Sequence, residues 1–484
     1  YQIVGYGCTP GQAIDGWHGV GLVSGEDVNQ VEDLSEEGGR TLLQTLEYLS
    51  SNKGRWAAMD PAGRLARLQQ ILARIEKLDH DAWGEAASRA YGYNPEQPEG
   101  DRQAALESMI NASICMGTVR HLIRTVTSQV KNNCPPKLKR ENRGGREVVQ
   151  VFPVDFADKF SPEGMVGCTG EVWRDPKTST PEETGQPDGN VCLVLGAGNQ
   201  SFLSFGDVMY QMFVEGSVCL MKHHPLRSFC GPFFDEAFAD LIDEGFFFAC
   251  DADLNESQLL VHHPLVDRVH MTGGVATHDA IVWGATEHER KENKAQNTPV
   301  LSKPMSSELG CVTPWIVTPG TEWSSADIHH MAGHLVAAFV AQNSCNCLSP
   351  KLLVLDADWP QCQAFVDAVR MLLGKTPHPP IHYPNTTERY EGFVSAYTES
   401  DMERIEGPQH SGLAEHAAEN TLPWLLIRLD ESRPKYALEN EAFAPVLAIY
   451  TLSASNDTEA FLEAAVPFVN ESVWGSLSCT LIVH

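Results

Sequence analysis

The sequence predicts an α/β protein in which helices cover both faces of mainly parallel sheets. Between residues 191 and 221, a strand-like run, a glycine turn, a helical run and a second strand-like run follow one another directly. Strand-like and helical runs then continue to alternate as far as residue 354. Parallel strands need a long crossover, which a helix supplies, so this alternation favours a parallel sheet. A chain of 484 residues with 42% hydrophobic residues is long enough for about two or three domains.

The first 130 residues are dominated by helix signals. The clearest segment begins with Asp60 as the cap and Pro61 at the first helical position. Its apolar residues recur at helical spacing and form one buried face: Leu65, Leu68, Leu72, Ile75 and Leu78. Strand-like runs at 148–152 and 170–173 then predict a strand excursion between about residues 145 and 175. Residues 175–190 are rich in Pro, Thr, Gly and acidic side chains, which predicts an exposed loop.

A βαβ unit is predicted after this loop. The buried strand 191–195 leads into the turn Gly196-Ala197-Gly198, and a helix with Phe or Met at helical spacing precedes the strand 217–221. The remaining expected elements are helix 233–244, strand 268–271, helix 277–284, strand 315–317, helix 326–340 and strand 352–354. The second α/β stretch therefore starts near Cys311.

Composition argues against several classes of function. The formal charge of −29 repels phosphate backbones and anionic lipid surfaces, so no nucleic acid and no membrane is expected as a partner. No long apolar run and no signal-peptide pattern is present, which predicts a cytoplasmic protein. The 13 cysteines are scattered without CxxC pairs, and the paired histidines lack further ligands at metal spacing, so no metal site is expected. Tyr1 and the strand-like run at 480–484 suggest that the sequence is a fragment.

Three short segments suggest an active site. Asn199 follows the glycine turn, at the carboxyl end of a predicted parallel strand, where α/β folds bind ligands. The alternative is that Asn199 only caps the next helix. Glu308 lies in Glu308-Leu309-Gly310 at a predicted domain junction, and the alternative is an ordinary surface carboxylate. Cys345 and Cys347 precede a predicted strand; one is interpreted as a nucleophilic thiol, and the alternative is an inert buried cysteine.

Taken in order, these segments resemble the aldehyde dehydrogenase superfamily. The resemblance covers roughly residues 60 to 484, and the interval from Asn199 to Lys222 is that of the family pattern. The matching segments are Asn199, Lys222 after Leu220-Met221, Thr272-Gly273-Gly274, Glu308-Leu309-Gly310, Cys347 and Glu441-Ala442-Phe443-Ala444-Pro445-Val446.

The resemblance implies a role for each matching residue. Cys347 is implied as the nucleophile that attacks an aldehyde, with the Asn199 amide and the Cys347 backbone N–H as oxyanion donors. Glu308 is implied as the general base that hydrolyses the thioester, a role that suits a partly buried carboxylate with a raised pKa.

The cofactor-binding residues are implied in the same way. Lys222 would bind the adenosine ribose, and Gly273-Gly274 would let the backbone approach the pyrophosphate at a helix start. Glu441 would hold the nicotinamide ribose, and Phe443 would bound the nicotinamide ring.

The sequence departs from the family near the nucleophile. Common members have Gly-Gln or Gly-Glu shortly before the cysteine, whereas this chain has Gln342-Asn343-Ser344-Cys345-Asn346-Cys347. Counting from Cys347, the run Leu348 to Val354 follows the family pattern into the next strand without a gap, so Cys347 is preferred. Cys345 stays open as the alternative nucleophile, or as a resolving thiol.

A second departure concerns the cofactor. Many family members carry a Glu three residues after the Lys, where it accepts hydrogen bonds from ribose hydroxyls and would repel a 2′-phosphate. Pro225 occupies that position here, with His223, His224 and Arg227 as neighbours. NAD or NADP is therefore expected as the cofactor, because a phosphate is tolerated here; the alternative is that this loop is remodelled and the histidines are surface residues.

The resemblance also implies an architecture. Residues 1–309 would form the N-terminal helical region and a Rossmann-type cofactor domain, and residues 310–484 an α/β catalytic domain, with the active site between them. The strand excursion resembles the family's oligomerisation hairpin, which implies a homodimer or homotetramer, and the family's usual C-terminal arm is missing beyond His484. Two alternatives remain: an acylating enzyme that transfers the acyl group to CoA or phosphate, and an inactive scaffold. Glu308 favours hydrolysis.

Overall fold

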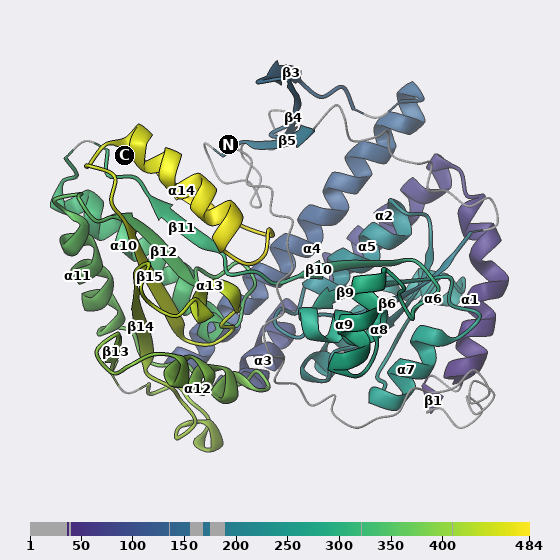
Figure 1. The fold of residues 1–484 in the computed structure, drawn as a ribbon. Coiled ribbons are helices and arrows are strands. Elements are labelled where there is room, and N and C mark those ends of the chain that lie inside the picture. Colours follow the sequence, from purple (N-terminus) through teal and green to yellow (C-terminus); the bar gives the residue numbers. More distant parts are fainter. Residues whose placement is uncertain are drawn as a thin grey trace.

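The computed structural model describes residues 36–37, 40–134, 136–154, 168–174, 189–320, 322–408 and 410–484. Two α/β bodies lie side by side, and helix α4 (Pro98–Asn132) runs diagonally through the middle of the view (Figure 1). A small antiparallel sheet lies at the upper edge of the molecule in this view (Figure 1). The predicted α/β class with a strand excursion is confirmed.

The N-terminal region of the first body is helical, as predicted for its described part. Its elements are β1 (Glu36–Glu37), β2 (Arg40–Thr41), α1 (Leu42–Ala57), α2 (Pro61–Ile75), α3 (His80–Ala90) and α4. Helix α2 begins where the sequence indicates, because the Asp60 side chain accepts a hydrogen bond from the Gly63 N–H and Pro61 has no N–H group that would need an acceptor. Its face packs against α4 and α6. The expectation for residues 1–35 lies outside the described residues.

The strand excursion forms a three-stranded antiparallel sheet of β3 (Arg140–Arg143), β4 (Arg146–Phe152) and β5 (Gly170–Arg174). In its register, Val149 lies opposite Val172, and Val172 is 52% exposed. Most of the predicted loop at 175–190 lies outside the described residues.

The first body contains a five-stranded parallel sheet whose order is β10-β9-β6-β7-β8. Its elements are β6 (Val191–Leu195), α5 (Leu203–Phe213), β7 (Val218–Lys222), the 3₁₀ helix η3 (Pro225–Cys230), α6 (Gly231–Asp243), β8 (Phe247–Cys250), α7 (Leu254–His262), β9 (Arg268–Gly273), α8 (Val275–Trp283), α9 (Glu287–Gln296) and β10 (Met305–Leu309). This is the Rossmann strand order, in which the chain reverses direction across the sheet between the first and fourth strands, here β6 and β9. Ligands bind beyond the carboxyl ends of strands at such a point.

Strand β10 was missed by the sequence analysis. Its sequence, Met-Ser-Ser-Glu-Leu, lacks both the alternation and the β-branched residues that mark a strand. It forms because the neighbouring strand β9 offers a free edge, and Glu308 lies opposite Thr272 in that pairing. Tertiary pairing rather than local preference therefore decides this element.

The second body contains a six-stranded sheet with the order β13-β14-β15-β12-β11-β16, parallel except for the edge strand β13. Its elements are β11 (Pro314–Val317), α10 (Ser325–Val340), the 3₁₀ helix η4 (Ala341–Ser344), β12 (Leu352–Asp356), α11 (Cys362–Leu373), α12 (Thr386–Ala396), β13 (Met402–Ile405), the 3₁₀ helix η5 (Glu415–Ala417), β14 (Trp424–Leu429), α13 (Tyr436–Glu439), β15 (Val446–Leu452), α14 (Thr458–Ser472) and β16 (Thr480–Ile482).

Both faces of this second sheet are buried. In β12, Leu352 and Val354 pack into one apolar cluster, while Leu353 and Leu355 pack into another on the opposite face. The apolar core of the first body draws its residues from the chain before residue 310, and these two clusters draw theirs from the chain after it. The chain crosses from one sheet to the other between β10 and β11. Within the described ranges, no helix is long and apolar enough to cross a membrane.

Candidate active site

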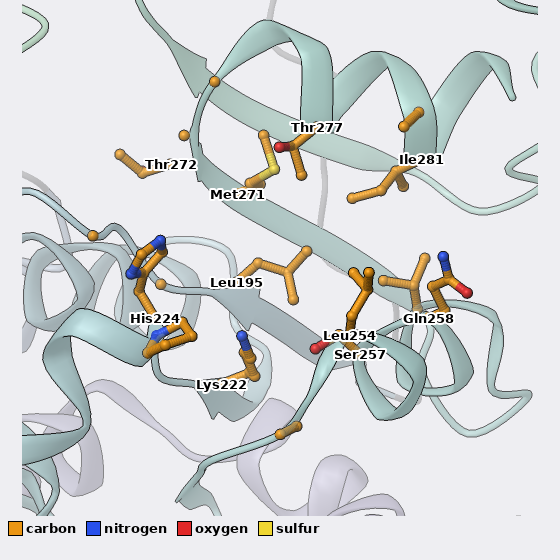
Figure 2. A pocket seen from close by; sticks show the side chains of 18 of the residues that line it. Leu195, Lys222, His224, Leu254, Ser257, Gln258, Met271, Thr272, Thr277 and Ile281 are labelled. Atoms are coloured by element: carbon orange, nitrogen blue, oxygen red, sulfur yellow. The ribbon is translucent and has the colours of Figure 1, made fainter. Parts of the chain in front are cut away.

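A cavity of about 330 Å³ lies at the carboxyl ends of β6, β7 and β9, where the order of the first sheet reverses. Figure 2 shows Lys222, His224, Leu254 and Ser257 on one side of it and Met271, Thr272, Thr277 and Ile281 on the other. Three of the sequence-predicted cofactor residues line this cavity: Lys222, Gly273 and Gly274.

The two glycines lie at a helix start, as the resemblance implies. Strand β9 ends at Gly273, and Gly274 is the N-cap residue of α8. A Cβ placed on Gly274 would meet nothing within 4 Å, so the backbone there faces open space. At Gly198, in contrast, a Cβ would collide with the His224 ring, so a larger residue there would displace that ring.

These features fit the dinucleotide that the resemblance implies. The unpaired N–H groups at the start of α8 favour a phosphate group. The Lys222 ammonium reaches the cavity from the end of β7, and the apolar side chains of Leu254, Met271 and Ile281 suit an adenine ring.

The neighbours of Lys222 present less positive charge than the sequence suggests. Burial and the nearby Lys222 and Arg227 charges lower the pKa of His224 to about 4, and burial also lowers the pKa of His223. Arg227 is 3% exposed, and its guanidinium lies over the Tyr91 ring, 4.7 Å from the centroid. It donates a hydrogen bond to the Asn199 carbonyl at 3.1 Å. The alternative that His223 and His224 are surface residues is wrong.

Asn199 is buried, and it does not cap the next helix. Helix α5 begins at Leu203 with Phe202 as its N-cap residue, so the capping alternative is wrong. The Asn199 carbonyl accepts hydrogen bonds from the Tyr91 hydroxyl and from Arg227, both at 3.1 Å. Among the described residues, the Asn199 side-chain amide makes no hydrogen bond, which leaves it available to a ligand.

The Asn199 turn contacts the start of the cysteine loop. The Gln200 amide donates a short hydrogen bond to the Gln342 side chain, and Gln342 in turn donates to the Tyr91 hydroxyl at 3.4 Å. Because Tyr91 also binds Asn199, one buried polar network joins both segments, although they are more than 140 positions apart in the sequence.

The segment before the cysteines has an unusual backbone. Gln342, Asn343 and Ser344 have φ values of 51°, 57° and 59°, a left-handed conformation that costs a residue with a Cβ about 1–2 kcal/mol. Side-chain contacts hold it: Gln342 through the network above, and Ser344 through a 3.0 Å hydrogen bond with the Ser349 hydroxyl. Three strained residues therefore stand where common family members have Gly-Gln or Gly-Glu.

The two candidate thiols differ in exposure. Cys345 is 1% exposed, and its thiol lies 3.4 Å from the Phe443 carbonyl and 3.6 Å from the Thr386 hydroxyl. Burial raises the pKa of Cys345 to about 11, so it is protonated at neutral pH. Cys347 is only partly buried, which favours it as the thiol that a substrate reaches.

Cys347 lies beside a buried ion pair. Lys351, with 2% of its side-chain surface exposed, lies 3.7 Å from the Glu441 carboxylate and donates to the Asn346 carbonyl at 2.7 Å. Burial raises the pKa of Cys347 and the Glu441 charge raises it further, while Lys351 lowers it. The sequence analysis missed Lys351, because a single Lys before a strand carries no signal of burial.

Glu441 is mostly buried, with 16% of its side-chain surface exposed, and it lies against the Glu-Leu-Gly segment. A Cβ on Gly310 would collide with its carboxylate, so the glycine permits this close approach. Burial raises the pKa of Glu441, partly offset by Lys351. Glu441 is therefore the carboxylate that acts on the Cys347 thiol.

Glu308 differs from the expectation. It is exposed near the end of the edge strand β10, as the surface-carboxylate alternative states, and it lacks the partial burial that would suit a general base. The position is exposed because β10 has no strand on its outer side in the described sheet. Its negative charge acts on the Tyr210 hydroxyl of α5, one of several causes that raise the pKa of Tyr210.

Phe443 contacts the cavity lining through Tyr383, a residue that the sequence analysis missed. Its ring packs edge-on against Tyr383 at 4.9 Å, and Tyr383 lines the cavity and stacks on His224 at 5.9 Å. Tyr383 lies in a Pro-rich loop without periodic pattern, so no sequence signal marks it. The structure thus brings Lys222, Gly273 and Gly274 to the cavity and Phe443 next to its lining residue Tyr383, while Cys347 and Glu441 lie together beside Lys351.

The surroundings of Cys347 predict a measurable pH dependence. Its raised pKa means that iodoacetamide, which reacts with the thiolate, should label Cys347 with a midpoint above the ordinary value of about 8.5. In Glu441→Gln the midpoint should fall, because a negative charge that disfavours the thiolate is removed. Mass spectrometry of the Cys347 peptide measures this rate. Glu463→Gln, on the exposed face of α14, is the control, and an equal shift in that variant would contradict the assignment.

Comparison with known proteins identifies the family and the fold. The model of the aldehyde dehydrogenase family matches residues 157–476. No curated protein matches the chain. Among solved structures, lactaldehyde dehydrogenase from Escherichia coli is 16% identical with a TM-score of 0.57, and the match covers 91% of this chain and 78% of that one.

Two ligand complexes are also similar in fold. The NADP complex of NADP-dependent glyceraldehyde-3-phosphate dehydrogenase from Bacillus halodurans C-125 is 14% identical, with a TM-score of 0.56 and coverage of 96% and 83%. Aldehyde dehydrogenase C from Pseudomonas syringae, in complex with NAD⁺ and octanal, is 12% identical, with a TM-score of 0.59 and coverage of 91% and 80%. These identities show a shared fold, and the family model matches most of the sequence. The chain therefore belongs to the aldehyde dehydrogenase family.

Proposed function

We propose that this protein oxidises an aldehyde to a carboxylic acid with NAD or NADP, through a thiohemiacetal and then a thioester on Cys347. The main support is the meeting of distant segments: the Asn199 turn contacts the cysteine loop through Gln200 and Gln342. Cys347 also lies within range of the Glu441 charge. A small-molecule aldehyde is therefore the expected partner.

In the first step, the Cys347 thiolate forms a bond to the carbonyl carbon, and the carbonyl π electrons move to oxygen. The unpaired Asn199 amide and the Cys347 N–H would stabilise that oxyanion. The C=O bond then re-forms as a hydride leaves the carbon, which produces the thioester. A bound nicotinamide ring supplies the acceptor for this hydride.

In the second step, water attacks the thioester, the C–S bond breaks, and the thiolate leaves. We assign Glu308 as the base that takes the proton from water, and an exposed side chain at the end of β10 is free to rotate for this task. Glu441 competes for the role, because it lies beside Cys347. Lys222, Gly273 and Gly274 would hold the adenosine and pyrophosphate part of the cofactor, while Glu441 and Phe443 would hold the nicotinamide part.

The proposal includes the division into a cofactor domain at 1–309 and a catalytic domain at 310–484. It also includes a cytoplasmic homodimer or homotetramer that uses the β3–β5 sheet, where Val172 is exposed. The rivals are an acylating enzyme that passes the acyl group to CoA or phosphate, and an inactive scaffold.

The test is dinucleotide reduction, followed by absorbance, with a panel of aliphatic, aromatic and semialdehyde substrates. The wild type should form NADH or NADPH together with one equivalent of acid. Glu308→Gln should lose about 10²-fold or more in turnover and accumulate acyl-enzyme, because deacylation lacks its base. Glu441→Gln is the matched comparison. Accumulation in Glu441→Gln alone would move the base role to Glu441, product formation that requires CoA would favour the acylating rival, and no turnover would favour the scaffold.

A further inference from the structure

Three carboxylates lie near enough to Lys222, at the end of the cavity proposed for the adenosine, to act on its charge. Asp253 lines the cavity together with Lys222, and Asp251, Asp253 and Glu256 line a second recess that adjoins it at Pro225. Burial lowers the pKa of Lys222, and the charges of all three carboxylates oppose this shift. These acids come from the loop after β8 and the first turn of α7, not from the segment that follows Lys222.

The nearby cations do not offset these carboxylates. His223 and His224 are neutral at neutral pH, because burial lowers the pKa of each. The Arg227 guanidinium is buried against Tyr91 and donates to the Asn199 carbonyl. Lys222 is therefore the one cation in this part of the described cavity lining, against three negative charges.

The N-terminus of α7 is also a poor binding site for a phosphate. A helix N-terminus normally offers unpaired N–H groups to an anion. Here Asp253 and Glu256 form a capping box, in which the Asp253 carboxylate accepts from the Glu256 N–H at 2.9 Å and the Glu256 carboxylate accepts from the Asp253 N–H at 2.8 Å. Two backbone donors are thus already bound by carboxylates, whose charges also oppose the helix dipole that would attract an anion.

We infer that this pocket selects a dinucleotide with a free 2′-hydroxyl on the adenosine ribose, and that Asp253 and Glu256 are the residues that reject a 2′-phosphate. This rests on the proposed use of a dinucleotide by this pocket. Carboxylate oxygens accept hydrogen bonds from ribose hydroxyls, whereas a 2′-phosphate with nearly two negative charges is repelled. The loop after β8 thereby takes over the task of the Glu that Pro225 replaces.

The chain allows this charge to be removed without loss of the cap. In Asp253→Asn/Glu256→Gln, Asn is as good an N-cap as Asp, and Gln serves in a capping box, as Gln44 does with Thr41 in α1. The control is Asp60→Asn, which makes the same change at the N-cap of α2, in the same body but outside the cavity lining. Thermal melting checks that each variant folds.

The experiment is calorimetric titration of the intact protein with NADH and with NADPH at low and high NaCl. The wild type should bind NADH about tenfold or more tightly than NADPH, and the gap should narrow as salt screens the repulsion. The double variant should close most of the gap by tighter binding of NADPH, with NADH changed much less.

Three outcomes would overturn the inference. The first is equal or tighter binding of NADPH by the wild type, and the second is an unchanged ratio in a folded double variant. The third is an equal change in Asp60→Asn. If either dinucleotide binds, the proposed function survives these results, whereas failure of both dinucleotides to bind would remove the proposed function as well. If the double variant does not fold, the preference of the wild type and its salt dependence still decide the matter.

Discussion

Cys347→Ala is expected to lower aldehyde-dependent dinucleotide reduction by about 10⁴-fold or more, because no other described thiol combines partial exposure with the position beside Glu441 and Lys351. Dinucleotide binding should be unchanged, since the cavity at the end of the first sheet does not include Cys347. Steady-state turnover and a binding titration on the same preparation separate the two effects.

Cys345→Ala is the matched control for this prediction. Cys345 is almost fully buried, and its thiol donates a hydrogen bond to the Phe443 carbonyl. Removal of this thiol should therefore lower the free energy of unfolding by about 1 kcal/mol and leave most of the turnover. Loss of activity in Cys345→Ala with retention in Cys347→Ala would reverse the assignment of the nucleophile. Loss in both would indicate that the strained loop, rather than one thiol, carries the function.

Lys351→Met is expected to have the largest effect on stability. It removes the cation 3.7 Å from the mostly buried Glu441 carboxylate, and breaking a buried ion pair on one side typically costs about 3–5 kcal/mol. It also removes the hydrogen bonds of the ammonium to the Asn346 and Ser349 carbonyls. Denaturant unfolding followed by circular dichroism measures the change.

A double variant separates the effect of an unpaired buried charge from the effect of lost packing. In Lys351→Met/Glu441→Gln both charges are absent, so much of the lost stability should return. Lys375→Met, at an exposed lysine after α11, should change the free energy of unfolding by less than about 0.5 kcal/mol. A loss in the double variant as large as in Lys351→Met alone would mean that Glu441 is not the group that Lys351 stabilises.

Local sequence was sufficient for elements with a strong internal pattern. Strand β6 was predicted with its observed bounds, because it is buried on both faces and is therefore continuously apolar. Helix α2 was predicted because its cap, its Pro61 and its apolar face agree with one another. Strand β10 was not, because a polar edge strand is held by its neighbour and has little pattern of its own.

Some features of the candidate site could also be predicted from the sequence, and others could not. The order of the motifs was readable from the sequence and indicated the family, which the family model confirms. The sequence could not show three other features: the burial of Glu308, the orientation of Arg227, and the identity of the acids near Lys222. Each depends on side chains from segments that are far apart in the chain. Lys351 and Tyr383 were missed for the same reason.

By itself, the sequence determined that two α/β bodies form and that an Asn, a Lys, a Gly-Gly turn and a cysteine loop follow one another in the family order, because periodicity and short motifs are local properties. Only the tertiary structure decided which thiol is enclosed, which carboxylate lies beside the other thiol and where the negative charge gathers around Lys222. Burial and electrostatic interaction depend on distance in space, and the chain order does not contain that distance.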